Sequence, residues 1–165
     1  MLRQMVVSGL TIDPYTNSPI MILKDMEGEK TLPIWIGLLE ATSIASELEK
    51  IKFSRPMTHD LFRNLLDSLQ LTIDHIEVCD LKDNTFYALI YIQGKEKIWT
   101  LDARPSDAIA IALRTDAPIL VDERVIQKSK HIDMGHKEAL TSEEAKKWTD
   151  ILENLSPEDF GKYKI

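Results

Sequence analysis

Two segments of the sequence place an arginine, a hydroxyl residue and an aspartate at the start of a predicted helix. They are residues 55–60 (RPMTHD) and 102–107 (DARPSD). A hydroxyl residue favours the N-cap position, whereas a proline fits the first helical turn, so two registers for each helix start are open. An aspartate in the first turn complements the positive end of the helix dipole. The residues concerned are Arg55, Thr58 and Asp60 in the first segment and Arg104, Ser106 and Asp107 in the second.

Helix capping does not require the two arginines. A cation beside a helix N-terminus is unfavourable unless a carboxylate or another anion lies between them. Arg55 and Arg104 can therefore form internal ion pairs with the aspartates, or they can hold a phosphate together with helix amides, Thr58 and Ser106. In the second case we expect the two guanidinium groups to lie close together around one solvent-filled cavity.

His59 is the best candidate for a general acid or base, because histidine exchanges its proton near neutral pH. A solvated polar residue in the first helical turn is the alternative. The carboxylates nearby could also bind Mg²⁺ or Mn²⁺, which prefer oxygen ligands, and Asp102 and Glu40 are the candidate metal ligands. No spacing requires a metal ion, since carboxylates at helix starts also act as caps.

Length and composition predict one soluble domain. The chain has 165 residues, with 20 basic and 27 acidic side chains, which is the size of a single domain. The lone cysteine, Cys79, cannot form an internal disulfide, so a cytoplasmic location is expected. The longest apolar run, residues 86–92, is too short to cross a membrane. A net charge of −7 argues against a broad basic surface, so any nucleic acid must bind at a local basic site.

The first half of the chain shows strand periodicity followed by helical periodicity. Three strands are predicted at residues 5–12, 20–23 and 32–36. Pro33 suits an edge strand because it has no amide hydrogen for the ladder. A helix follows over residues 41–48, and a second one follows Pro56. The polar side of the first helix, which we expect to face solvent, consists of Glu40, Ser43, Glu47 and Glu49.

The second half repeats this order. Strands are predicted at residues 73–79, 86–92 and 98–101, and a helix opens near residue 105. Residues 86–92 are apolar on both faces, which predicts a central strand. The six successive apolar residues from Ala108 to Leu113 predict a helix that is buried on all sides.

The two halves align without gaps at an offset of 67 residues. The matches include Asp13 with Asp80 and Ala41 with Ala108, and we interpret them as a duplicated β-β-β-α unit at about 5–50 and 72–116. Coincidental similarity of two hairpin-helix segments is the alternative. The predicted fold is α+β, with a mainly antiparallel sheet, helices packed on it, and a charged extension at 129–165 that contains one amphipathic helix.

Three segments together resemble the bifunctional nuclease (BFN) domain family over roughly residues 1–128. They are residues 32–41 (LPIWIGLLEA), 55–61 (RPMTHDL) and 102–110 (DARPSDAIA). The resemblance implies a nuclease that hydrolyses RNA and DNA with little sequence preference. For such a reaction, residue type and position at the two helix starts favour His59, Asp107 and Asp60 for catalysis, Arg55, Arg104, Thr58 and Ser106 for phosphate, and Asp102 and Glu40 for a metal ion.

Two other functions fit the same residues. The chain could be a non-enzymatic binding or assembly module that forms a homodimer, with Arg–Asp pairs that only stabilise the fold. It could also sense a small acidic ligand in the same cleft. Fully paired and buried Arg and Asp groups would favour the structural module, whereas an open cleft lined by Arg55, His59 and Asp107 with unpaired donors would favour the nuclease.

Overall fold

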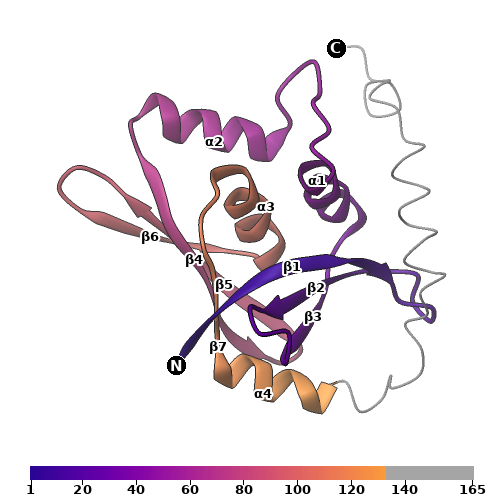
Figure 1. The fold of residues 1–165 in the computed structure, drawn as a ribbon. Coiled ribbons are helices and arrows are strands. Elements are labelled where there is room, and N and C mark those ends of the chain that lie inside the picture. Colours follow the sequence, from indigo (N-terminus) through magenta and orange to yellow (C-terminus); the bar gives the residue numbers. More distant parts are fainter. Residues whose placement is uncertain (133–165) are drawn as a thin grey trace.

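The computed structural model describes residues 1–132, which form one seven-stranded sheet and four helices (Figure 1). The predicted α+β class is therefore confirmed. The strands are β1 (Leu2–Ile12), β2 (Pro19–Asp25), β3 (Thr31–Trp35), β4 (Thr72–Lys82), β5 (Thr85–Gln93), β6 (Ile98–Ala103) and β7 (Ile119–Asp122). The helices are α1 (Leu38–Leu48), α2 (Thr58–Ser68), α3 (Pro105–Thr115) and α4 (Glu123–Ile132).

The sheet consists of two three-stranded meanders joined by a short strand. Its strand order is β3-β2-β1-β7-β4-β5-β6. All neighbours pair antiparallel except β4 and β7, which are parallel. The prediction of a mainly antiparallel sheet is confirmed, and Pro33 lies in the edge strand β3 as expected.

The order β-β-β-α occurs twice along the chain, since β1–β3 lead into α1 and β4–β6 lead into α3. The first hairpin of the second unit turns at Asp83 and Asn84, which both have positive φ. Two such residues are typical of the tight turn whose twist matches that of the strands. The repeated order agrees with the duplication that the sequence suggests, and a common origin of the two halves stays a prediction.

Helix α3 lies at the centre of the molecule, between α1 and α2 (Figure 1). None of its residues from Ala108 to Ala112 is more than 4% exposed, and Leu113 is half-buried. The expected burial on all sides is therefore confirmed for this apolar run except at its last residue. The helix also contacts β4 and β5. Because α1 and α2 both pack on α3, the starts of α2 and α3 come close together in space.

Several features were not predicted from the sequence. β7 has only four residues, too few to show a periodicity, and α4 was missed with it. β5 is paired on both edges, as expected of an inner strand, but only one of its faces is fully buried. The amphipathic helix expected in the extension lies outside the described residues. No helix within residues 1–132 is long and apolar enough to cross a membrane.

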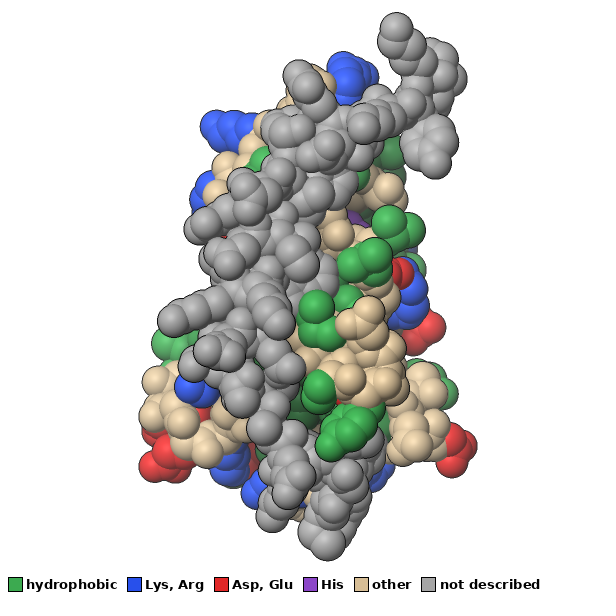
Figure 2. Space-filling view, turned by 90° about the vertical axis from the view of Figure 1, so that its right-hand side faces the viewer, with side chains coloured by type: hydrophobic (Ala, Val, Ile, Leu, Met, Phe, Trp, Pro, Cys, Tyr) green, Lys and Arg blue, Asp and Glu red, His purple; other side chains and the backbone are tan. Residues whose placement is uncertain are grey.

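Apolar side chains also lie at the surface. Figure 2 shows hydrophobic side chains gathered on one face of the molecule, with acidic and basic ones mostly near its margin. Leu38 and Leu39 at the start of α1 are exposed, as are Leu61 and Leu65 on α2. Helix α2 therefore covers the core with one side, which includes the buried Leu66, and presents other leucines to solvent.

Candidate functional site

Helices α2 and α3 both carry an aspartate as their third residue. In α2 the N-cap is Met57, and its amide donates to Oδ2 of Asp60 over 3.0 Å. In α3 the N-cap is Arg104, and the first helical residue is a proline. The register with a hydroxyl residue at the N-cap is therefore wrong for Thr58 and Ser106, since both lie inside the helices. The alternative register, with proline at the first position, holds for α3.

Asp107 joins His59 to Arg104. Its Oδ1 lies 2.9 Å from His59 Nε2, and its Oδ2 accepts from Arg104 Nε over 2.8 Å. Arg104 Nη1 also donates to Glu40 Oε1 over 2.7 Å. Residues of α1, α2 and α3 thus meet in one polar cluster, in which Arg104 stays 64% exposed.

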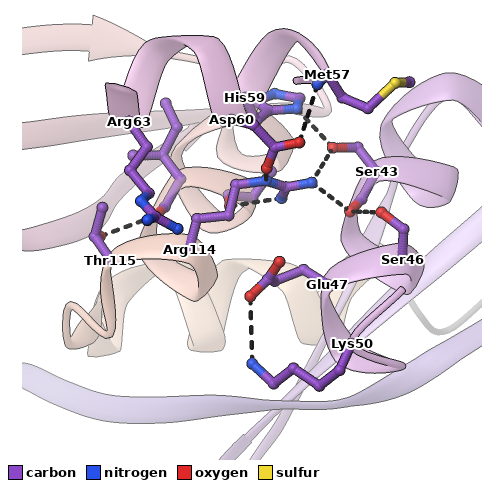
Figure 3. A network of polar contacts seen from close by, with 12 residues as sticks. Ser43, Ser46, Glu47, Lys50, Met57, His59, Asp60, Arg63, Arg114 and Thr115 are labelled. Carbon is purple, nitrogen blue, oxygen red and sulfur yellow. Dashed lines mark hydrogen bonds and ion pairs between the residues drawn. The ribbon is translucent and has the colours of Figure 1, made fainter. Parts of the chain in front are cut away.

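Asp60 takes part in a second, buried ion pair with Arg114 of α3 (Figure 3). Arg114 Nε donates to Asp60 Oδ1 over 2.7 Å, and the Arg114 side chain is only 2% exposed. The same guanidinium group donates to the Ala110 carbonyl and to both the carbonyl and the hydroxyl oxygen of Ser43. Such complete pairing is what a buried arginine requires.

Ser43 connects the two clusters. Its Oγ lies 2.7 Å from His59 Nδ1 and 3.2 Å from Arg114 Nη2 (Figure 3). The expectation that Ser43 faces solvent is wrong, because α1 packs on α3 through that side of the helix. Neither Ser43 nor Arg114 was among the site residues predicted from the sequence. Arg114 directly follows the apolar run of α3, and a charged residue in a buried helix is a signal that a partner must exist.

Arginine contacts keep the two aspartates ionised. Partial burial disfavours the charge of Asp107, but the hydrogen bonds from Arg104 and His59 outweigh it and lower the pKa of this carboxyl. Burial likewise opposes the charge of Asp60, and its bonds from the Met57 amide and Arg114 lower the pKa. The hydrogen bonds to Asp107 and Glu40 in turn raise the pKa of Arg104. All three groups are therefore charged at neutral pH.

Two cavities open beside this cluster, with volumes of about 530 and 380 Å³. Both are lined by Thr58, His59, Arg104 and Asp107. The larger one continues as an apolar groove between α2, α3 and β6, and the smaller one lies against α1. A ligand in either cavity would meet one imidazole, one exposed guanidinium group and two carboxylates, which are Asp107 and Asp102 in the larger cavity and Asp107 and Glu40 in the smaller one. The guanidinium group and the imidazole suit an anion that undergoes proton transfer.

The structure separates three of the candidate residues from this set. Arg55 lines a different cavity of about 540 Å³, between the end of α1 and the start of α2, so the expected neighbourhood of Arg55 and Arg104 is wrong. The physical reason is that Arg55 precedes its helix by three residues, whereas Arg104 is itself an N-cap. Asp60 faces Arg114 and lines the same cavity as Arg55. Ser106 is buried and lines a fourth cavity of about 340 Å³, which Arg104 also lines but His59 and Asp107 do not.

The candidate metal ligands do not converge. Glu40 is engaged by Arg104, and Asp102 lines the 530 Å³ cavity, whose lining does not include Glu40. Within residues 1–132 no three or more His, Cys, Asp and Glu side chains are grouped so that they could hold a metal ion. The described carboxylates therefore do not fit a metal centre, and we derive no chemical step through one.

A family model described as the bifunctional nuclease domain matches residues 21–133. Among curated proteins, the Mycobacterium tuberculosis protein Rv1829 is 37% identical over 159 residues, which is 93% of this chain and 95% of that protein. It carries only the description of an uncharacterized protein. Its similarity therefore supports a shared domain over nearly the whole chain and gives no activity.

Plant relatives carry a functional name. Bifunctional nuclease 1 of Oryza sativa subsp. indica is 26% identical over 109 residues, which is 64% of this chain and 33% of the plant protein. Bifunctional nuclease 1 of Arabidopsis thaliana is 23% identical over 134 residues, which is 74% of this chain and 41% of that protein. The matches thus cover less than half of either plant nuclease.

Proposed function

Because the chain belongs to the bifunctional nuclease domain family, we propose that it hydrolyses phosphodiester bonds of RNA and DNA with little sequence preference. The observation that carries the proposal is the double role of Asp107. One carboxylate holds both His59 and the exposed Arg104 at the edge of the same two cavities. Proton transfer and phosphate binding are the two tasks that such a reaction needs.

In this proposal Arg104 binds the scissile phosphate. Its Nη2 has no hydrogen-bond partner within the described part of the chain, so the guanidinium group keeps a donor for a phosphate oxygen. The positive charge would stabilise the negative charge that grows in the transition state. His59 moves the proton of the attacking group, and Asp107 fixes the orientation of its ring.

Arg55 serves a neighbouring phosphate in this proposal. Its side chain makes no hydrogen bond or ion pair with the described residues, and Lys52, which lines the same cavity, makes none either. Phe53 lines both the cavity of Arg55 and the 380 Å³ cavity of His59, so the two cavities are adjacent. A nucleic-acid strand that reaches from one to the other would place one phosphate at each arginine.

The test measures cleavage of labelled single- and double-stranded RNA and DNA by the full chain. We expect Arg104→Ala to lower the rate by about 100-fold or more, the usual cost of losing one donor to the developing charge. Arg124→Ala is the matched control, because Arg124 is also an exposed arginine paired with an aspartate but lines none of these cavities. Equal cleavage by wild type and Arg104→Ala would point to a contaminating nuclease. Parallel assays with a chelator test Mg²⁺ or Mn²⁺ separately.

A non-enzymatic homodimeric module is the second candidate. It is supported by the complete pairing of Arg114, which is the behaviour of an arginine that only stabilises the fold. The edge strand β6 has exposed apolar residues, including Ile98 and Leu101, and its free backbone groups could pair with β6 of a second copy. A stable dimer in light scattering, together with no cleavage of any of the four substrates, would favour this candidate over the nuclease.

A further inference from the structure

We propose that the Ser43 hydroxyl is the nucleophile, so that the phosphoryl group is carried on the protein before water releases it. This inference rests on the proposed function and adds a covalent intermediate to it. It comes from one juxtaposition: Ser43 Oγ lies 2.7 Å from His59 Nδ1, and His59 Nε2 lies 2.9 Å from Asp107 Oδ1. A hydroxyl within hydrogen-bond reach of a base, which a third group orients, is the geometry of an activated nucleophile.

With a neutral His59 ring, the hydrogen bonds leave one assignment of protons around Ser43. Asp107 is ionised and can only accept, so Nε2 of His59 must carry a proton and donate it. Arg114 can only donate, so it uses a lone pair of Ser43 Oγ. In the neutral ring Nδ1 then has a free lone pair, and the Ser43 hydroxyl donates to it. The base is therefore already placed to take the proton of Ser43.

Two charged side chains favour the transfer of the proton from Ser43 to His59. Arg114 lies 3.2 Å from Oγ and is held in place by Asp60, by the Ala110 carbonyl and by the Ser43 carbonyl. Asp107 stabilises the imidazolium that His59 becomes. Arg114 thus has a use beyond the stability of the fold, since its guanidinium group faces the reacting oxygen.

A substrate can reach Ser43. Ser43, His59 and Arg104 all line the 380 Å³ cavity, which also has apolar walls from Leu39 and Met57. A phosphodiester in this cavity would meet the hydroxyl and the exposed guanidinium group together. Ser46 lines the same cavity, but its hydroxyl donates to the Ser43 carbonyl and has no histidine partner among the described residues. Of these two serines, only Ser43 has a base.

The reaction balances in two displacements. In the first, Ser43 Oγ forms a bond to phosphorus, its proton moves to His59 Nδ1, and the bond from phosphorus to the leaving sugar oxygen breaks. A water molecule gives a proton to that sugar oxygen and becomes hydroxide. In the second, hydroxide attacks phosphorus, the bond to Oγ breaks, and Oγ regains its proton from Nδ1. One water is consumed, and the products are an alcohol and a phosphate monoester.

The experiment treats the full chain with a fluorophosphonate, which transfers its phosphonyl group to an activated serine and releases fluoride. Peptide mass spectrometry then locates the adduct. We expect one adduct, on Ser43, with Ser46 unmodified as an internal control. We also expect His59→Ala to slow the labelling by about 100-fold or more. No adduct, an adduct elsewhere, or equal labelling of the His59→Ala variant would overturn the inference.

The same samples separate this inference from the nuclease proposal. Cleavage of nucleic acid without an adduct on Ser43 would refute the covalent step, and a direct attack by water would remain. An adduct on Ser43 without cleavage of RNA or DNA would support the nucleophile and refute nucleic acid as its substrate. Circular dichroism of the His59→Ala variant shows whether it is folded, and slow labelling of a folded variant reflects the loss of the base.

Discussion

Asp60 and Asp107 are each the third residue of their helix, but they bind different partners. Asp60 accepts from its own N-cap amide and from the buried Arg114, so its charge is used inside the protein. Asp107 accepts from His59 and from Arg104, whose side chain is 64% exposed. The difference follows from burial, because Arg114 would be an uncompensated charge without Asp60, whereas Arg104 keeps contact with water and with Glu40.

We predict that Asp60→Asn lowers the free energy of unfolding by about 3 kcal/mol at pH 7, because it leaves the Arg114 charge without its partner. The pKa of Asp60 lies below its usual value of 3.8, so its stabilising effect is complete above that pH. As the pH falls below 3.8, protonation of the wild-type carboxyl removes this stabilisation step by step, and the loss is complete below the lowered pKa of the folded state. Urea unfolding of both proteins should therefore show a difference that shrinks in acid.

Asp67→Asn is the control for this prediction. Asp67 lies in the same helix and pairs with Arg63, but both side chains are well exposed. Its substitution should change the free energy of unfolding by less than about 1 kcal/mol at either pH. A loss in the Asp60→Asn variant no larger than in this control would show that the contact with Arg114 does not stabilise the fold.

The helix starts explain how the site is assembled from distant segments. The beginnings of α2 and α3 carry His59 and Asp107, and packing of α1 on α3 adds Ser43 and Glu40. Helices α1, α2 and α3 and six of the strands could be placed from periodicity because their apolar residues repeat over at least four positions. The position of β7 could not, since its pairing with β1 and β4 depends on contacts between residues more than 40 positions apart.

The site itself was only partly predictable. Three of its residues could be predicted because each has an ionisable side chain at a helix start, namely His59, Asp107 and Arg104. Ser43 does not stand out, since a serine on the polar side of an amphipathic helix is typical of a solvated surface. The predicted position of Arg55 was wrong because the Arg-Pro pair is the same in both segments. Arg55 precedes its helix by three residues, whereas Arg104 is the N-cap of its helix.

Helix α2 gives a prediction about what holds His59 in place. Leu66 is 4% exposed and belongs to the core, whereas the neighbouring Leu65 is 53% exposed. We expect Leu66→Ala to lower the free energy of unfolding by about 2–5 kcal/mol and Leu65→Ala by less than about 1 kcal/mol. Urea unfolding measures both variants. Equal losses would mean that α2 is packed through a different face than the structure has it.

At the scale of the whole molecule, the charge opposes the proposed substrate. The chain carries a net charge of −7, and its sequence pI is about 5.1. The exposed basic residues that line these cavities are Arg104 and, on the adjacent cavity, Lys50, Lys52, Arg55 and Arg63. Lys50 and Arg63 are each paired with a carboxylate nearby in the sequence, which leaves Arg104, Arg55 and Lys52 for phosphates. Binding must then rest on few phosphate contacts, which has a measurable consequence for its dependence on salt.

We predict a weak salt dependence for binding of single-stranded DNA, measured by fluorescence anisotropy with the His59→Ala variant so that the strand stays intact. Three phosphate contacts give a slope of about −2 in a plot of log affinity against log salt concentration, since each contact contributes about −0.7. Arg55→Ala in the same background should reduce the slope by about 0.7, whereas Arg124→Ala should leave it unchanged. A slope several times steeper, or one that Arg55→Ala does not alter, would mean that the strand binds over a different surface from the two adjacent cavities.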